Sequence, residues 1–428
     1  MIGKADHSQR QAAQLCQLQA LLREVLSSNP FYGAKLRSAG VHSADDVATM
    51  QQYANLPFTT KQELSVDQAG CPPYGTNLTY PAQRYIRLHQ TSGTTGERLR
   101  WLDTEDSWNW FGRGWEAVYG GAGVTREDRI FFAFSFGPFI GFWSAHEGAR
   151  RLGAMAIPGG GMSSVQRLEA IASNHATVLV CTPTYALHLA DVAAAQGLDL
   201  AQDTSVRITI HAGEPGAGLP ATRARIEQAW GARCFDHAGA TEVGAWGFEC
   251  TEQDGLHLNE DQFIFEIIDP QTTQPALEGE LVITNLGRTG MPVIRYRTGD
   301  RVRWHEPGSC ACGRTFRRLE GGVIGRLDDA LVIRGINVYP SLIENVVRGF
   351  PQVGEFAVHV RRPGAMDELE IDIEVEEGAE AVVEGLAAQL HRGLALRPRV
   401  RAVARGSLPR FEMKARRVTD HRQPAQNG

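Results

Sequence analysis

This chain of 428 residues lacks several sequence features that are typical of secreted, membrane and nucleic-acid-binding proteins. Seven cysteines, a small and odd number, do not indicate the disulfide framework of a secreted domain. The most apolar run, residues 130–143, is interrupted by glycine and proline and is shorter than the roughly 18 residues that cross a bilayer. The N-terminal residues MIGKADHSQRQAAQ lack the apolar segment of a signal peptide. A net charge of −6 argues against nucleic acid as a partner. These absences favour a cytoplasmic protein that binds neither a membrane nor nucleic acid.

The chain has the composition of a globular protein, with 43% hydrophobic and 21% charged residues. Its length suggests two or more domains. Leucines at helical spacing in residues 12–27 predict an amphipathic helix. From about residue 129 to 290, short apolar runs alternate with helix-like stretches, which is typical of a layered α/β domain. The predicted strands lie within residues 129–134, 176–181, 206–213 and 279–286, and a helix is predicted within 219–230.

The pattern changes after Gly325. Residues 367–377, DELEIDIEVEE, alternate strictly between acidic and apolar side chains and predict a half-exposed strand. A helix-like stretch at 381–394 and a short strand near 399–404 follow. We therefore expect an α/β fold in two parts. A large N-terminal domain of layered sheets and helices would comprise residues 1–325, and a small α+β domain residues 326–428.

The stretch TSGTTG, residues 91–96, is a poor helix and a poor strand, so it predicts a loop with exposed amides and hydroxyls. Such loops suit phosphate oxygens. The usual phosphate loop, G-x-x-x-x-G-K-[ST], does not fit, because the glycines are too close and no Lys-Ser/Thr pair follows. On its own the stretch is therefore either a different phosphate loop or a polar turn. Its residues are Thr91, Ser92, Gly93, Thr94, Thr95 and Gly96.

Four further motifs follow TSGTTG along the chain. They are HAGATEVG (237–244), YRTGD (296–300), GRLDDALVIRGINVYPSLIE (325–344) and SLPRFEMKARRVTD (407–420). In this order the motifs resemble those of the adenylate-forming (ANL) superfamily, which includes the acyl-CoA synthetases. The wording of LPFTTKQEL (56–64) and CACGRTFRRLEGGVIGRLDD (310–329) resembles the phenylacetate–CoA ligase family within it. The resemblance extends from about Leu56 to Asp420.

The resemblance implies an ATP-dependent aryl-acid–CoA ligase with ATP, Mg²⁺ and coenzyme A as cofactors. Such an enzyme joins a carboxylic acid to AMP, releases pyrophosphate, and passes the acyl group to the CoA thiol after its C-terminal domain rotates. The first step brings an anionic carboxylate against an anionic phosphate. Cations and amide dipoles must therefore offset the repulsion.

The resemblance also assigns the residues of the adenylation step. The loop 91–96 would wrap the β- and γ-phosphates. Glu242 would hold Mg²⁺, which favours carboxylate oxygen, and Thr241 would contact the α-phosphate. Asp300 would accept both ribose hydroxyls. Lys414 would bridge the substrate carboxylate and the α-phosphate. Lys61 matches a second family lysine that is directed at the phosphates, with a surface role as the alternative.

Further matches concern the adenine ring, the hinge and the CoA tunnel. Ala238 stands where the family usually has an aromatic residue that stacks on adenine, so His237 is either a replacement or a neutral packing residue. Asp328, with Arg326 nearby, matches the hinge. Gly335 matches a loop that lines the pantetheine tunnel, where the missing side chain lets the backbone approach the thioester. The residues expected to form the adenine slot are Gly213, Glu214, Pro215, Asp236, His237 and Gly239.

Three cysteines and one histidine form a candidate zinc site. Cys250, His257, Cys310 and Cys312 would complete a tetrahedral shell with no open position, which is typical of structural zinc. The C-x-C spacing departs from the usual C-x₂-C, so free thiols are the alternative. Members of the resembled family are similar to this chain at these positions. The remaining cysteines are predicted to be small buried hydrophobes. They are Cys16, Cys71, Cys181 and Cys234.

An aromatic concentration in residues 134–143 predicts an acyl pocket for a flat ring, of the phenylacetate, benzoate or anthranilate type. His146 and Glu147 are the polar candidates for contacting a ring substituent. The alternative is that these aromatics belong to the core. The pocket residues are predicted to be Phe134, Phe136, Gly137, Phe142, His146 and Ala212.

Other functions remain open at this stage. A basic stretch, residues 392–405, would suit either the CoA 3′-phosphate or a carrier-protein helix, so the acceptor could be a carrier protein. A non-catalytic sensor of ATP or acid would not need Lys414, Glu242, Thr241 and Asp300 together. An interaction module built on the Cys/His group alone would leave the other motifs unexplained. The resemblance further implies that the chain can form a homodimer.

Overall fold

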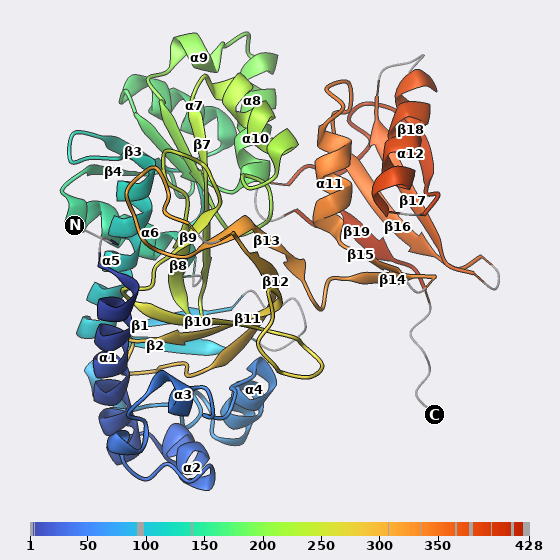
Figure 1. Cartoon of the computed structure of the whole chain (residues 1–428). Helices are drawn as coiled ribbons and strands as arrows, with labels where there is room; N and C mark the ends of the chain where they lie inside the picture. The colour runs from blue at the N-terminus through green and yellow to red at the C-terminus, as the bar shows by residue number, and fades with distance from the viewer. Residues whose placement is uncertain are drawn as a thin grey trace.

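The computed structural model describes residues 3, 5–91, 98–137, 140–306, 308–334, 336–363, 366–375, 380–394, 396–411 and 415–422, with the backbone alone for Phe142. Two lobes, each with its own hydrophobic core, lie side by side (Figure 1). The large lobe extends to Arg326 and the small lobe comprises residues 331–422. The mixed α/β architecture confirms the predicted fold class. No helix in the described ranges is long and apolar enough to cross a membrane.

The chain begins with helices that lie against one end of the large sheet. The predicted helix at 12–27 is confirmed within α1, whose Leu18, Leu22 and Val25 are buried against Ile264 and Ile294. The N-terminal elements are α1 (His7–Ser28), α2 (Pro30–Ser38), η1 (Ala44–Asp46), α3 (Met50–Tyr53), α4 (Lys61–Gly70) and η2 (Ala82–Arg84), followed by the hairpin β1 (Tyr85–Gln90) and β2 (Arg100–Thr104).

An 11-stranded sheet in the order β10-β11-β12-β13-β9-β8-β7-β6-β5-β3-β4 forms the centre of the large lobe. The strands from β4 to β7 pair in parallel, and the others pair antiparallel. The strands are β3 (Arg129–Phe132), β4 (Met155–Pro158), β5 (Val178–Cys181), β6 (Ile208–His211), β7 (Arg233–Ala240), β8 (Gly244–Phe248), β9 (Leu256–Leu258), β10 (Phe263–Ile268), β11 (Glu278–Asn285), β12 (Tyr296–Trp304) and β13 (Arg318–Arg326). The predicted strands are confirmed: β3, β5 and β6 are shorter than their apolar runs, and β11 is displaced by one residue.

Helices cover both faces of the parallel strands, which explains why these strands are continuous apolar runs. Ile130 and Phe132 pack with α5 and α6 on one face, whereas Phe131 packs with α7, α8 and α10 on the other. The helices of this lobe are α5 (Glu105–Ala122), α6 (Gly141–Leu152), α7 (Ser164–Ser173), α8 (Pro183–Ala195), α9 (Leu200–Asp203) and α10 (Pro220–Trp230). In such doubly covered parallel sheets, ligands bind outside the carboxyl ends of the strands.

The small lobe packs two helices on a four-stranded sheet of order β18-β17-β16-β19, beside a short hairpin. Its α11 lies against α10 of the large lobe (Figure 1). Its elements are β14 (Leu331–Ile333), β15 (Ile336–Val338), α11 (Pro340–Arg348), β16 (Phe356–Arg361), β17 (Glu368–Glu374), α12 (Glu380–Leu394), β18 (Arg399–Val403) and β19 (Val418–Asp420).

The prediction that β17 is half-exposed is wrong, because its acidic face is covered as well. Glu370 accepts from Arg361 at 2.9 Å, and Asp372 accepts from Arg401 at 2.8 Å. Glu374, only 1% exposed, is also paired with an arginine. The neighbouring strands β16 and β18 supply Arg361 and Arg401, so the charges that indicated solvent are neutralised within the lobe.

Candidate active site

The two segments predicted to bind adenine come together at the carboxyl ends of β6 and β7. These strands are parallel neighbours with His211 opposite Asp236, so residues 212–215 leave the sheet after β6 beside residues 237–239, which continue within β7 and pair with β8. Gly213 has φ +96, a conformation that side-chain-bearing residues rarely adopt. The two segments predicted to form the adenine slot are therefore neighbours in the structure.

His237 is a packing residue in this structure. It is buried, its Nδ1–H donates to the carbonyl of Gly247 at 2.7 Å, and its ring lies 4.5 Å from that of Trp115. Burial lowers the pKa of His237 to about 4, so the ring is neutral. Of the two roles that the sequence left open, packing is the one that these contacts support.

Asp236 is surrounded by groups that the sequence did not single out. Burial raises the pKa of Asp236 to about 7, with Glu249 as the next cause. Glu249 accepts from the Asp236 N–H at 2.7 Å and pairs with Arg223 at 2.6 Å. A Cβ at Gly218 would come within 2.8 Å of the Asp236 carboxylate, so the chain leaves room for this group. Single charged residues without a motif gave no signal for this network.

Asp300 and Arg326 meet across β12 and β13. Arg326 Nη1 lies 3.3 Å from Asp300 Oδ1, and Arg326 Nε donates to Asp328 Oδ1 at 2.8 Å. Burial raises the pKa of Asp300 to about 6, although Arg326 acts in the opposite direction. The negative charge of Glu242 also raises this pKa. At neutral pH Asp300 is ionised and able to accept hydrogen bonds.

Lys61 lies beside this group, at the first position of α4. The segment before it runs along β12, because the Thr59 N–H donates to the Arg295 carbonyl and the Arg297 N–H donates to the Thr59 carbonyl, both at 2.9 Å. Together with Arg326, Lys61 lowers the pKa of Asp328 in opposition to burial. The structure thus brings Lys61 near Asp328, the residue predicted to be the hinge.

The TSGTTG stretch begins directly after β1, which pairs antiparallel with β2, and Thr91 is its one residue within the described ranges. Thr91 is buried, its N–H donates to the Leu99 carbonyl at 3.0 Å, and its hydroxyl accepts from the Leu99 N–H at 3.1 Å. Thr91 therefore closes the base of the loop. Some predicted residues lie outside the described ranges or, for Phe142, outside the described side chains. They are Ser92, Gly93, Thr94, Thr95, Gly96, Phe142, Gly335 and Lys414.

The aromatic residues predicted for the acyl pocket form a ring cluster beyond the carboxyl end of β3. Phe136 lies 5.0 Å from Phe134, 4.6 Å from Trp143 and 6.1 Å from His146 between ring centroids. Gly137 accepts from Trp143 Nε1 at 3.0 Å. Phe134, Phe136 and His146 are only partly buried, so their rings are not simply core. Ala212 follows β6 at the same edge of the sheet.

Glu147 does not join His146 in this cluster. Its carboxylate accepts from Arg150 Nε at 3.0 Å, and its stem packs against Gly112 of α5. Adjacent helical residues point about 100° apart, so only His146 can face the rings. Burial lowers the pKa of His146, which favours its neutral form.

The predicted metal ligands meet at one place. The ligand atoms of Cys250, His257, Cys310 and Cys312 all lie within 4.8 Å of one another. Cys250 Sγ is 3.6 Å from Cys310 Sγ, and Cys312 Sγ is 3.5 Å from His257 Nε2. Metal–ligand bonds of about 2.0–2.3 Å at tetrahedral angles separate such atoms by roughly 3.5–3.8 Å, so the set fits zinc. Burial lowers the pKa of His257 to about 4, which keeps the ring in its neutral, ligating form.

The other cysteines divide into two pairs. Cys181 and Cys234 are buried, as predicted, whereas Cys16 and Cys71 are exposed. The prediction of burial is wrong for the latter two, because a single cysteine on a helix or at a helix end carries no sign of which side faces the core.

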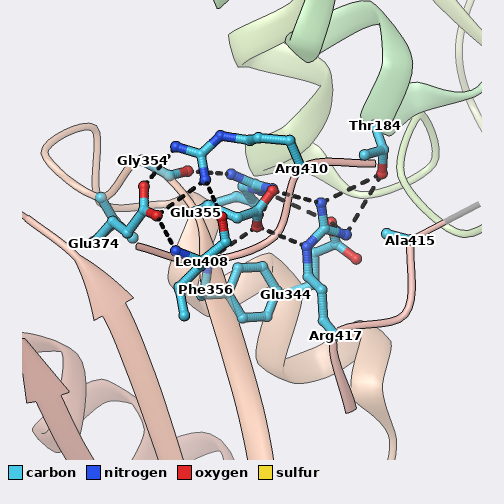
Figure 2. Close-up of polar contacts among 12 residues, drawn as sticks. Thr184, Glu344, Gly354, Glu355, Phe356, Glu374, Leu408, Arg410, Ala415 and Arg417 are labelled. Atoms are coloured by element: carbon cyan, nitrogen blue, oxygen red, sulfur yellow. Dashed lines mark hydrogen bonds and ion pairs between the residues drawn. The ribbon is translucent and has the colours of Figure 1, made fainter. Parts of the chain in front are cut away.

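The contact between the lobes is polar and involves the last described segment of the small lobe. Arg417 Nε donates to Glu355 at 2.8 Å within its own lobe, and its Nη2 lies 3.4 Å from the Thr184 hydroxyl of α8 (Figure 2). The Ala415 N–H donates to Glu214 at 2.8 Å across the lobes. The other oxygen of Glu214 accepts from the Thr184 N–H at 3.0 Å. Glu214 thus has a role between the lobes that the sequence did not indicate.

A large α/β lobe with loops at the carboxyl ends of its strands, joined to a small α+β lobe, is the architecture of an adenylate-forming enzyme. The model of the family described as AMP-binding enzyme C-terminal domain matches residues 335–422. The phenylacetate-coenzyme A ligase of Pseudomonas putida is 34% identical over 424 residues, which cover 96% of this chain and 93% of that protein. The enzyme of the same name from Escherichia coli K12 is 34% identical over 440 residues, covering 98% and 97%.

The chain therefore belongs to the phenylacetate–CoA ligase family. It is an ATP-dependent acid–CoA ligase, an enzyme that forms a carbon–sulfur bond.

Solved structures resemble this chain to different degrees. 2-Hydroxyisobutyryl-CoA ligase in the postadenylation state with 2-HIB-AMP has a TM-score of 0.92 at 29% identity, covering 98% of this chain and 91% of that one. The same enzyme with CoA in the thioesterification state has a TM-score of 0.74 at 30% identity and the same coverage. The anthranilate CoA ligase AuaEII shares the fold at 20% identity and a TM-score of 0.58, covering 77% of this chain and 65% of that one.

The proximity of Arg326 to Asp300 leads to a prediction that does not depend on any substrate. Arg326→Gln should raise the pKa of Asp300 above 6 by roughly one unit, because a neighbouring cation favours the ionised carboxylate. Carbon-13 NMR titration of the Asp300 carboxyl group would measure this pKa. Arg303→Gln is the control, since Arg303 lies on β12, the strand of Asp300, but pairs with Glu278. An unchanged pKa in Arg326→Gln would show that the two groups are not in contact.

Proposed function

We propose that this ligase activates an aromatic carboxylic acid, of the phenylacetate, benzoate or anthranilate type, and transfers the acyl group to CoA. The ring cluster of Phe134, Phe136, Trp143 and His146 carries the proposal, because partly buried rings at a ligand-binding edge suit a flat substrate. The names of the relatives at 32–34% identity support a ring-bearing acid. His146 is the polar group placed to contact a ring substituent.

In the adenylation step, cations and dipoles of the large lobe offset the charge of the phosphates. The loop 91–96 wraps the β- and γ-phosphates, and Lys61 approaches them from the start of α4. Thr241 contacts the α-phosphate and Glu242 holds Mg²⁺, which neutralises developing negative charge. Lys414, contributed by the small lobe, bridges the substrate carboxylate and the α-phosphate. Attack by the carboxylate then releases pyrophosphate.

The nucleoside is held by the segment that follows β6 and by residues within β7 and β12. Asp300 accepts both ribose hydroxyls, and Arg326 orients its carboxylate. The backbone of residues 213–215 and the segment 236–239 form the two sides of the adenine slot. His237 packs against Trp115, so the adenine ring here has small side chains such as Ala238 beside it in place of an aromatic partner.

The thioester step requires a second arrangement of the lobes, with Asp328 as the hinge and Gly335 at the pantetheine tunnel. The higher TM-score against the postadenylation state than against the thioesterification state, 0.92 and 0.74, supports a rotation of the small lobe. The contacts of Ala415 with Glu214 and of Arg417 with Thr184 would then be lost. The pairing of Arg417 with Glu355 lies within the small lobe and would persist.

A panel of acids tests the proposed substrate class. Pyrophosphate exchange into ATP is measured with phenylacetate, benzoate, 2-aminobenzoate and hydroxybenzoates, with 2-hydroxyisobutyrate as the non-aromatic comparison, followed by thioester formation with CoA. One aromatic acid should exceed 2-hydroxyisobutyrate in kcat/KM by at least about tenfold, because burial of ring carbons stabilises its complex. His146→Ala should change the ranking of substituted rings but not of benzoate and phenylacetate.

Two results would contradict different parts of the proposal. Equal or faster exchange with 2-hydroxyisobutyrate would contradict an aromatic substrate. Exchange without transfer to CoA would identify a carrier protein as the acceptor.

The Cys/His cluster is proposed to hold one structural zinc ion. β8, β9 and β13 are successive neighbours that bring Cys250 and His257 beside the loop 305–317, which carries Cys310 and Cys312. β13 then leads from this cluster to Arg326, roughly 25 Å away along the strand. Four protein ligands leave no open position, so zinc here would hold the loop and take no part in the reaction.

Metal analysis of the purified chain should find about one zinc per chain, and Cys310→Ser should lose it. Removing zinc with a chelator, followed by removal of the chelator, should lower the thermal midpoint but leave pyrophosphate exchange intact below it. Cys71→Ser, at an exposed cysteine, is the matched control and should retain the metal. Full zinc content in Cys310→Ser would contradict the site.

A further inference from the structure

A fully buried arginine lies directly beneath the Thr241–Glu242 turn. Arg288 follows β11 and is 0% exposed, as is its partner Asp103 on β2. Arg288 Nε donates to Asp103 Oδ1 and Nη2 to Asp103 Oδ2, both at 2.8 Å. The guanidinium also lies over two rings, 4.9 Å from the centroid of Trp101 and 4.7 Å from that of Phe111. A planar, paired guanidinium between aromatic faces has almost no freedom to move.

The remaining nitrogen of this guanidinium is directed at the predicted catalytic turn. Arg288 Nη1 donates to the backbone carbonyl of Thr241 at 2.7 Å and to that of Glu242 at 3.1 Å. Both side chains of the turn are themselves partly exposed, as substrate-facing groups need to be. One side chain therefore fixes the backbone of both residues at once.

The same pair connects the turn to the β1–β2 hairpin. Asp103 belongs to the β1–β2 hairpin, and a second contact joins this hairpin to the Arg288 segment, from the Leu102 N–H to Met291 Sδ at 3.2 Å. The segment is closely packed, because a Cβ at Gly287 would lie 2.1 Å from the ring of Trp110. Three parts of the chain that are distant in sequence thus form one rigid frame.

We propose that the Asp103–Arg288 pair is a positioning device that fixes the Thr241–Glu242 turn relative to the β1–β2 hairpin. The inference rests on the proposed roles of that turn in binding the α-phosphate and Mg²⁺. A misplacement of about 1 Å at a reacting group can cost about a hundredfold in rate. Lysine cannot replace Arg288, because one ammonium cannot reach both carboxylate oxygens and both carbonyls in one plane.

A buried ion pair with a purely structural role is the competing explanation, and Arg10 provides the matched control. Arg10 is 3% exposed and pairs with buried Glu260 at 3.4 Å. It donates to the carbonyl of Thr315 at 3.2 Å and lies over the ring of Phe316. Arg10 therefore has the same kinds of contact as Arg288 but none with the turn.

The test compares Arg288→Lys with Arg10→Lys in pyrophosphate exchange at varied free Mg²⁺, with the thermal midpoint measured in parallel. Arg288→Lys should lower the maximal exchange rate by about ten- to a hundredfold and raise the half-saturating Mg²⁺ concentration severalfold, with the KM of the acid within about threefold. Arg10→Lys should lower the thermal midpoint comparably but keep the rate and the Mg²⁺ dependence. If Arg288→Lys does not fold, Asp103→Asn, which keeps the size of the side chain, should show the same change in weaker form.

Glu242→Gln, measured alongside, separates the proposed role of the turn from the proposed role of the Asp103–Arg288 pair. If Glu242→Gln keeps normal exchange and normal Mg²⁺ dependence, the proposed role of the turn is wrong. If Glu242→Gln loses exchange while Arg288→Lys behaves like Arg10→Lys, the turn is catalytic but the pair does not position it, and the present inference is overturned.

Discussion

The repulsion between a carboxylate and a phosphate is the constraint on which the rest of this structure depends. Both reactants are anions, so donors and cations have to converge on the place where they meet. The structure assembles candidates for this task from separate parts of the large lobe: the β1–β2 connection, the start of α4 and the turn between β7 and β8. Each lies at the end of a regular element. A sheet covered on both faces holds these ends in place.

The interface between the lobes is consistent with a reaction in two steps. Its hydrogen bonds involve backbone groups and single side chains, such as Arg225 of α10 donating to the carbonyls of Phe350 and Val353 at 2.8 Å. Contacts of this kind can exchange for water at little net cost, whereas an apolar interface could not open so readily. Arg417, in contrast, is held within its own lobe by Glu344 and Glu355, so the proposed rotation would leave these two ion pairs intact.

The sequence predicted those features that depend on local patterns or on a chemically distinctive set. The apolar runs located β3, β5, β6 and β11, and the rarity of cysteine and histidine made the cluster at Cys250 recognisable. Pairings of charged residues over long sequence distances were not predictable. Asp103 and Arg288 are 185 residues apart, and each residue considered alone would be predicted to lie on the surface. The prediction that the acidic face of β17 is exposed is wrong for the same reason, because its arginine partners lie on other strands.

The central claim is that the small lobe serves the two half-reactions in two arrangements. Its most direct test is single-turnover kinetics of each half-reaction in Lys414→Ala and Glu214→Gln. Adenylation should fall by about 10²–10³-fold in Lys414→Ala and by less in Glu214→Gln, because the former loses a cation that acts in the transition state and the latter weakens one contact between the lobes. Thioester formation from supplied acyl-adenylate should remain near the wild-type rate in both. Equal losses in the two half-reactions would contradict the account.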